Sequence, residues 1–166
     1  MLAGSIRDLQ RMGGEETVRI VIGGDHAGVI LKAEVSRLLL ELGHEVRDLG
    51  TNTAEPVDYP DFCIPVAEAV SRGEADRGII FGGTGNGEAI AANKVLGIRC
   101  AVCHDVTTAR LARQHNDANM MSLGARIVGS EVAKEIVRTF LTTSFEGGRH
   151  IPRIEKIARY EREHKR

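Results

Sequence analysis

Residues 77–94 read RGIIFGGTGNGEAIAANK and predict the unit from which the fold is built. The opening apolar run ends in two glycines, as is typical of a buried strand. The glycine-rich loop then runs into an apparent helix. Backbone N–H groups at such a junction commonly hold a phosphate or a carboxylate. The stretch therefore raises the question of which anion is held, and whether Glu88 binds it or reacts with it.

The rest of the chain repeats this alternation. Further strands are predicted at residues 18–24, 44–50, 98–105 and 119–125. The helices between them are predicted at residues 29–43, 61–73, 106–116 and 130–144. Asp61 is the candidate N-cap of the second helix, and a basic, mostly helical tail begins at residue 147.

This order of elements predicts an α/β fold, a Rossmann-like three-layer αβα sandwich with a five-stranded parallel sheet and a C-terminal helical tail. Ligands of such folds bind beyond the carboxyl ends of the strands. The loops GGDHAG (23–28) and GGTGNGE (82–88) both follow strands, so they should lie at the same edge of the sheet.

Length and composition limit the function classes. The 166 residues suffice for one domain, at 18–166, after a flexible N-terminal extension at 1–17. A net charge of −1 argues against nucleic-acid binding. No apolar run approaches the roughly 18 residues of a membrane span, and no signal-peptide pattern opens the chain. A cytoplasmic protein without membrane or nucleic-acid partners is expected.

Three cysteines, an odd number without zinc-site partners, indicate reduced thiols. Cys100 and Cys103 form a CxxC pattern within an apolar strand run. Because a strand alternates its side chains, the two should point to opposite faces of the sheet and pack in the core.

Two nucleotide motifs fail on spacing. A P-loop requires a lysine after its last glycine, and a dinucleotide fingerprint started from Gly83 requires glycine where Glu88 stands. The cradle residues Gly83, Gly85, Asn86 and Gly87 still suit an anion. Beside a carboxylate, that anion is best explained as transient, such as an enediolate.

Candidate reactive groups accompany this cradle. Asp25 and His26 follow the first strand, and His115 lies in RQHND. The arginines suited to bidentate phosphate binding are Arg126, Arg149 and Arg153. A carboxylate base, histidines and arginines at one sheet edge predict proton abstraction beside the carbonyl of a phosphorylated sugar.

Each candidate also has a structural interpretation. Asp25 and His26 can cap the following helix, and Glu88 can stabilise a helix dipole. Arg149 and Arg153, one turn apart, can form a solvated basic face. Convergence on one edge of the sheet favours the functional interpretation.

Seven stretches in chain order strengthen it. They are GGDHAG, DLGT, VDYPDF, GGTGNGEAIAANK, GIRCAVC, ARLARQHNDANMMSLGAR and FEGGRHIPRI. From residue 18 to about 157 they closely resemble the ribose-5-phosphate isomerase B family, which includes the subunits of galactose-6-phosphate isomerase. The resemblance implies isomerisation of ribose 5-phosphate and ribulose 5-phosphate through a cis-enediolate, in the pentose phosphate pathway, without metal or cofactor.

The resemblance also implies residue roles. Asp25 and His115 match ring-opening residues, and Thr84 matches a proton relay in the enediolate cradle. Contacts to the phosphate and the sugar are implied for His26, Arg126, Arg149 and Arg153, and pocket-lining positions for Tyr59 and Asn116. It further implies a homodimer or dimer of dimers with shared active sites, in which the neighbouring subunit supplies His115, Asn116 and Arg126.

One position departs from the common pattern. Many members carry a cysteine base immediately before GTG, where this chain has Gly82. A subgroup shares the glycine and uses a glutamate at the position of Glu88 as base. The resemblance therefore implies that Glu88 transfers the proton. Burial should raise the pKa of Glu88, and the cradle amides should lower it.

Three alternatives stay open at this point. The substrate could be another sugar phosphate, based on a tetrulose, allose or galactose. The chain could be a non-catalytic phosphosugar-binding subunit, although such a subunit needs no base. A nucleotide-binding, flavodoxin-like module is the third alternative.

Overall fold

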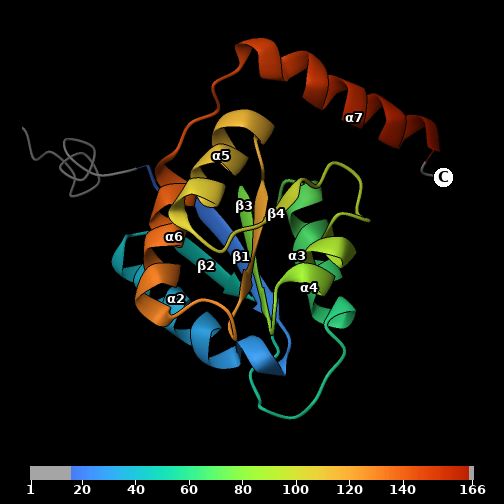
Figure 1. Ribbon diagram of the computed structural model, residues 1–166. Coiled ribbons are helices and arrows are strands. Elements are labelled where there is room, and N and C mark those ends of the chain that lie inside the picture. Colours follow the sequence, from blue (N-terminus) through green and yellow to red (C-terminus); the bar gives the residue numbers. More distant parts are fainter. Residues whose placement is uncertain (1–15, 165–166) are drawn as a thin grey trace, which may run out of the picture.

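The computed structural model describes residues 16–164, and the predicted extension at 1–17 falls mostly outside them. Five parallel strands form one sheet with helices on both faces (Figure 1). The strands are β1 (Arg19–Gly24), β2 (Glu45–Asp48), β3 (Arg77–Gly82), β4 (Cys100–Val102) and β5 (Met120–Gly124). The predicted three-layer α/β sandwich is confirmed.

The strand order is β2-β1-β3-β5-β4. In the register, Gly24 pairs with Phe81 and Gly82 pairs with Gly124. The ends of β1, β3 and β5 therefore form one side of the sheet, called here the carboxyl edge. The opposite side, where these strands begin, is the amino edge.

Helices cover both faces of the sheet (Figure 1). One face packs against α2 (Val29–Glu41), α5 (Val106–Asn116) and α6 (Ser130–Thr142). The other packs against α3 (Pro60–Ser71) and α4 (Asn86–Ala92). Alternate strand residues feed the two cores: Ile20 and Ile22 face the first, whereas Val21 faces the second.

The cysteines follow the same alternation. Cys103 packs in the core under α5 and α6, and Cys100 packs against the core under α3 and α4. The prediction of opposite faces is confirmed. Burial raises the pKa of Cys103 to about 12 and also raises those of Cys63 and Cys100, so the thiols are poor nucleophiles.

One helix start differs from the prediction. The second helix begins at Pro60 with Tyr59 as N-cap, and Asp61 lies within its first turn. Proline is favoured at the first helical position because its missing N–H has no intrahelical acceptor there. The helix therefore begins before Asp61, whose carboxylate complements the helix dipole instead.

The tail forms α7 (Ile151–His164), which lies outside the two helical layers, and its Glu161 accepts from the Gly97 N–H at 2.9 Å (Figure 1). None of its side chains is buried, and Ile151, Ile157 and Tyr160 are exposed. A hollow of about 410 Å³ separates its Ile154 and Ile157 from the β4 side of the sheet. The helical tail is confirmed, with an apolar side that its own chain leaves uncovered. Within residues 16–164, no helix combines the length and apolarity needed to cross a membrane.

Candidate active site

The two glycine-rich loops pack against each other at the carboxyl edge, as predicted. The Asp25 backbone N–H donates to the carbonyl oxygen of Phe81 at 3.0 Å. A Cβ on Gly24 would lie 1.9 Å from that same oxygen, so only glycine fits there. This close approach brings Asp25 and the loop after β3 into one site.

Glu88 folds its carboxyl group back against Gly82. A Cβ built on Gly82 would lie 1.6 Å from Oε1 of Glu88 and 2.1 Å from its Cδ. The carboxyl group therefore fills the space that any side chain at position 82 would need. Glu88 is only 4% exposed, although it lies at the start of a helix beside the loop.

The protonation of Glu88 reflects this burial. Loss of hydration raises the pKa of Glu88 above its ordinary value, and the negative charge of Asp25 raises it further. The backbone N–H groups of Glu88 and Gly85 bind the carboxylate and lower the pKa in part. The two opposing effects match the sequence-based expectation, and the net upward direction of the pKa suits a proton-accepting group.

Asp25 caps a short helix and also lies near Glu88. Its Oδ1 accepts a hydrogen bond from the Ala27 N–H at 2.9 Å, which caps the 3₁₀ helix η1 (His26–Gly28). The capping interpretation is therefore correct for this oxygen. The buried carboxylate also lies close enough to Glu88 to raise the pKa of that residue.

Side chains from β5 and the β4–α5 connection shape the loop that joins β3 to α4. Gly85 has φ 81°, and its carbonyl accepts from the Ser122 hydroxyl at 2.7 Å. Thr84 is exposed, its hydroxyl accepts from the Asn86 N–H at 3.3 Å, and its carbonyl lies 3.0 Å from Nε2 of His104. The sequence interpretation missed Ser122 and His104. A serine within an apolar strand was the available signal for the first.

Tyr59 and His26 line the rim of this site. A Cβ on Gly87 would lie 2.8 Å from Cζ of Tyr59, so the phenol ring rests directly on that glycine. Nδ1 of His26 accepts from the Val57 N–H at 3.2 Å and ties the loop before α3 to the end of β1. Both predicted pocket residues therefore lie at the carboxyl edge.

Arg126 also belongs to this edge. Its backbone N–H donates to the Gly83 carbonyl at 3.0 Å, and its Nη1 lies 3.4 Å from the position of a Cβ on Gly83. The expectation that Arg126 reaches the loop from a neighbouring subunit is corrected, because the chain places the residue at its own loop. The turn directly after β5 accounts for this position.

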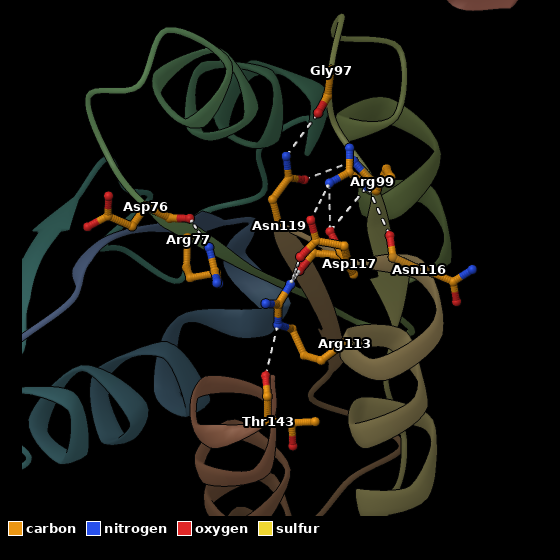
Figure 2. A network of polar contacts seen from close by, with 10 residues as sticks. Asp76, Arg77, Gly97, Arg99, Arg113, Asn116, Asp117, Asn119 and Thr143 are labelled. Atoms are coloured by element: carbon orange, nitrogen blue, oxygen red, sulfur yellow. Dashed lines mark hydrogen bonds and ion pairs between the residues drawn. The ribbon is translucent and has the colours of Figure 1, made fainter. Parts of the chain in front are cut away.

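His115 and Asn116 lie at the opposite, amino edge. Helix α5 leaves the carboxyl edge after β4 and runs back, so its last residues reach the start of the strands. There the Arg99 Nε–H donates to the Asn116 carbonyl at 2.9 Å (Figure 2). The predicted convergence on a single edge is therefore wrong for these residues. A five-residue strand, about 17 Å long, separates them from Glu88.

Arg149 and Arg153 also lie at the amino edge. They lie in the 3₁₀ helix η2 (Gly148–His150) and in α7, after a segment whose Glu146 N–H donates to the Gln114 carbonyl at 3.0 Å. That bond fixes the segment to the end of α5. The arginines thus gather with His115 and not with the glycine loops of their own chain.

A network of charges fixes the end of α5 (Figure 2). Asp117 ends the helix with φ 42°, and its carboxylate accepts from Arg113 at 2.8 Å and from Arg99 at 3.3 Å. Arg113 is 5% exposed and also donates to the Ala118 carbonyl at 2.7 Å. The sequence interpretation missed this network, since no spacing rule connects Arg99 to Asp117.

Comparison with known proteins finds one matching family and relatives that align along most of the chain. A family model described as Ribose/Galactose Isomerase matches residues 20–157. Ribose-5-phosphate isomerase B of Escherichia coli is 50% identical over 143 residues, which are 86% of this chain and 96% of the relative. A D-erythrulose-4-phosphate isomerase of Pectobacterium atrosepticum is 44% identical over 88% of this chain and 97% of its own length.

Solved structures agree in fold. Ribose-5-phosphate isomerase B of Clostridium thermocellum is 53% identical, with a TM-score of 0.87, over 88% of this chain and 99% of that one. The enzyme of Mycoplasma genitalium, solved with bound ribulose-5-phosphate, is 45% identical with a TM-score of 0.84. That alignment covers 87% of this chain and 96% of the other.

Proposed function

The chain belongs to the ribose/galactose isomerase family, and we propose that it interconverts ribose 5-phosphate and ribulose 5-phosphate. One observation carries the proposal: the Glu88 carboxyl group is buried in the space beside Gly82, within the glycine-rich loop. A carboxyl group with a raised pKa in that position suits a base better than a surface charge.

In the proposed mechanism, Glu88 moves a proton between two carbon atoms of the sugar. In the open-chain aldose it removes the proton from C2, the C–H electrons form the C1–C2 double bond, and the C1 carbonyl becomes an oxyanion. The resulting Glu88 carboxylic acid then returns this proton to C1. The proton on O2 moves to O1, so the product is the ketose and the carboxylate is regenerated.

The loop stabilises the intermediate. Its backbone N–H groups lie beside the carboxyl group and can hold the negative charge of the cis-enediolate. The exposed Thr84 hydroxyl is the proposed relay between O2 and O1. Tyr59 and His26 border the sugar, and the Arg126 guanidinium, which lies over Gly83, faces the substrate phosphate.

A second protomer completes the site. Ring opening requires a proton donor and acceptor across the furanose, and the proposed pair is Asp25 with His115 of the second protomer. Within one chain they lie at opposite edges, so the amino edge of one copy must meet the carboxyl edge of another. The same contact supplies Asn116, Arg149 and Arg153.

The uncovered side of α7 supports this assembly. Its exposed Ile151, Ile157 and Tyr160 and the hollow beside it offer an apolar surface that a homodimer would bury. We propose a homodimer or a dimer of dimers with shared sites. The three protonated thiols fit a cytoplasmic enzyme of the pentose phosphate pathway.

The direct test measures kcat/KM for ribose 5-phosphate with the purified chain. Glu88→Gln keeps the size and removes the base, so a loss of about 10² or more is expected. Glu131→Gln, which changes an exposed carboxylate in the first turn of α6, is the matched control and should retain activity. A Glu88→Gln variant near wild type would exclude this residue as the base.

Substrate choice is tested with the same assay. The relative from Pectobacterium carries the name of a four-carbon substrate, so tetrulose, allose and galactose phosphates belong in the panel. A preference for one of them over ribose 5-phosphate would keep the mechanism and change the substrate. An inactive chain that still binds sugar phosphates would favour the non-catalytic subunit, and binding of ATP or flavin mononucleotide would favour the nucleotide-binding module.

A further inference from the structure

Three ligand-type side chains converge at the amino edge. His115 lies in the last turn of α5, Glu146 lies in the segment between α6 and η2, and His150 ends η2. Their ligand atoms all lie within 4.8 Å of one another. Among residues 16–164, this is the group of three or more His, Cys, Asp or Glu residues whose ligand atoms lie close enough together to hold a metal ion.

The distances come close to those of a coordination shell. Oε2 of Glu146 lies 3.4 Å from Nε2 of His150 and 3.9 Å from Nε2 of His115. Ligand atoms about 2.1 Å from a tetrahedral Zn²⁺ are separated by about 3.4 Å. The Glu146–His150 distance therefore fits such a shell, whereas the half-exposed His115 must move closer before all three atoms can bind one ion. The imidazole rings, stacked 4.4 Å apart, must also tilt toward each other.

The chemistry of the three atoms favours zinc over magnesium or calcium. Two imidazole nitrogens with one carboxylate oxygen form a donor set used by zinc enzymes that leave a fourth position open. Magnesium and calcium prefer all-oxygen shells. We infer that His115, Glu146 and His150 form a Zn²⁺ site, with its fourth position open on the exposed side of His115 and Glu146.

The surroundings prepare His150 as a ligand. Its side chain is 5% exposed, and Nε2 accepts from the Arg149 Nε–H at 3.4 Å. Nε2 of His150 also lies 3.4 Å from Oε2 of Glu146, so one cation could bind both atoms. Zn²⁺ must displace the long Arg149 contact, and the charge of that arginine limits the affinity.

Occupation of the site has a consequence for turnover, which rests on the proposed function. Nε2 of His115 bound to zinc has no lone pair or proton for ring opening. Arg149, displaced from His150, would also change position in the shared site. Zn²⁺ should therefore inhibit the isomerase reversibly, although the reaction itself uses no metal.

Metal binding is measured first, on the full chain after chelator treatment. Co²⁺ serves as spectroscopic probe, since tetrahedral cobalt absorbs strongly in the visible range, and Zn²⁺ should displace one equivalent per chain. Glu146→Gln and His150→Gln should each weaken binding at least tenfold. His164→Gln is the matched control, because His164 stacks on Tyr160 in α7 and should leave binding unchanged.

Two outcomes overturn the site. Equal affinities for wild type and His150→Gln would exclude this cluster, and thiolate-to-cobalt absorption would assign the metal to cysteine instead. The kinetic arm is read separately. Zinc should inhibit wild type but act at least tenfold more weakly on Glu146→Gln. Zinc that binds the cluster without slowing turnover would overturn the inhibition, whereas an inactive metal-free wild type would count against the proposed function.

Discussion

The two edges of the sheet are built in different ways. At the carboxyl edge, backbone contacts fix the site: Asp25 N–H to Phe81, Arg126 N–H to Gly83, and a carboxyl group pressed against Gly82. At the amino edge, side-chain charges hold the end of α5 in place. The carboxyl edge carries the proposed carboxylate base. The amino edge carries histidine and arginine side chains instead.

This difference supports the proposal that each chain contributes two half-sites. Among the arginines predicted to bind the phosphate, only Arg126 lies at the carboxyl edge, beside the loop that holds the Glu88 carboxyl group. Arg149 and Arg153 follow the segment fixed to the end of α5 and lie with His115 at the amino edge. In the proposed dimer each edge supplies what the other lacks, and the following experiments separate them.

The largest effect is expected from Gly82→Cys at the carboxyl edge. The new side chain would occupy the position of the Glu88 carboxyl group, so kcat/KM should fall by about 10²–10⁴ through loss of the base. Combining Gly82→Cys with Glu88→Ala removes the overlap and installs a thiol. This double variant should exceed Glu88→Ala at least tenfold and become sensitive to alkylation.

Gly82→Ala with Glu88→Ala is the control for that rescue, since it fills the space without a thiol and should stay inactive. Equal activity of the two double variants would show that packing alone, and no base at this position, accounts for the change. The assay is kcat/KM with ribose 5-phosphate in each case.

The second experiment combines two variant chains, each with a substitution at a different edge of the sheet. Glu88→Gln and His115→Ala chains carry different tags and are co-expressed, and the mixed species is isolated with the two parents. Shared sites give every mixed dimer one intact and one doubly changed site, so the isolated mixed dimer should show about half of wild-type activity and the unfractionated random mixture about a quarter. Activity no higher than the mean of the parents would contradict the shared site.

A third experiment weakens the amino edge alone. Asp117→Asn retains a residue that tolerates φ 42°, but it removes the charge that pairs with the buried Arg113 and with Arg99. The free energy of unfolding should fall by about 1–3 kcal/mol, because the buried Arg113 keeps its carbonyl contacts but loses its negatively charged partner. Chemical denaturation measures this loss. Glu155→Gln, an exposed change on α7, should leave stability unaltered.

The smallest effect concerns the pH dependence of the carboxyl edge. Since folding raises the pKa of Glu88, its ionised form opposes folding, and this destabilisation appears as pH rises through the raised pKa. Glu88→Gln should therefore melt a few degrees higher than wild type at neutral pH, with no difference below the ordinary glutamate pKa. Thermal scans across pH measure the difference. An equal Tm at every pH would contradict the raised pKa.

The same group should set the acid limb of activity. The base must be ionised, so kcat/KM should decline as pH falls through a pKa above 4.5, the ordinary glutamate value. A limb at or below that value would indicate that the loop N–H groups outweigh burial in the free enzyme, whose ionisation kcat/KM reports.

Sequence reasoning was strongest where local rules apply. The alternation of apolar runs predicted the five strands, and α5 has the predicted bounds because Asp105 and Thr108 form a capping box. The glycine loops were placed correctly, since carboxyl ends of parallel strands share one edge. The family pattern pointed to Glu88, and the packing against Gly82 supplies a physical reason for that pairing.

Sequence reasoning was weaker where the direction of a helix or strand decides which edge of the sheet a residue reaches. His115 lies in the last turn of a helix that starts near the site, and the length of this eleven-residue helix places it on the other side of the sheet. Arg126 follows β5 directly and stays at the carboxyl edge, although the pattern grouped it with His115. Contacts such as His150 on His115 join residues 35 positions apart, which no periodicity encodes.

The contact between Gly82 and Glu88 also limits how this lineage can change. On the proposed mechanism, a cysteine acquired first would displace the proposed base, and a glutamate lost first would leave the loop without it. Either single change would then lower activity. Positions 82 and 88 lie six codons apart, so two separate codons must change nearly together before a thiol could replace the carboxylate.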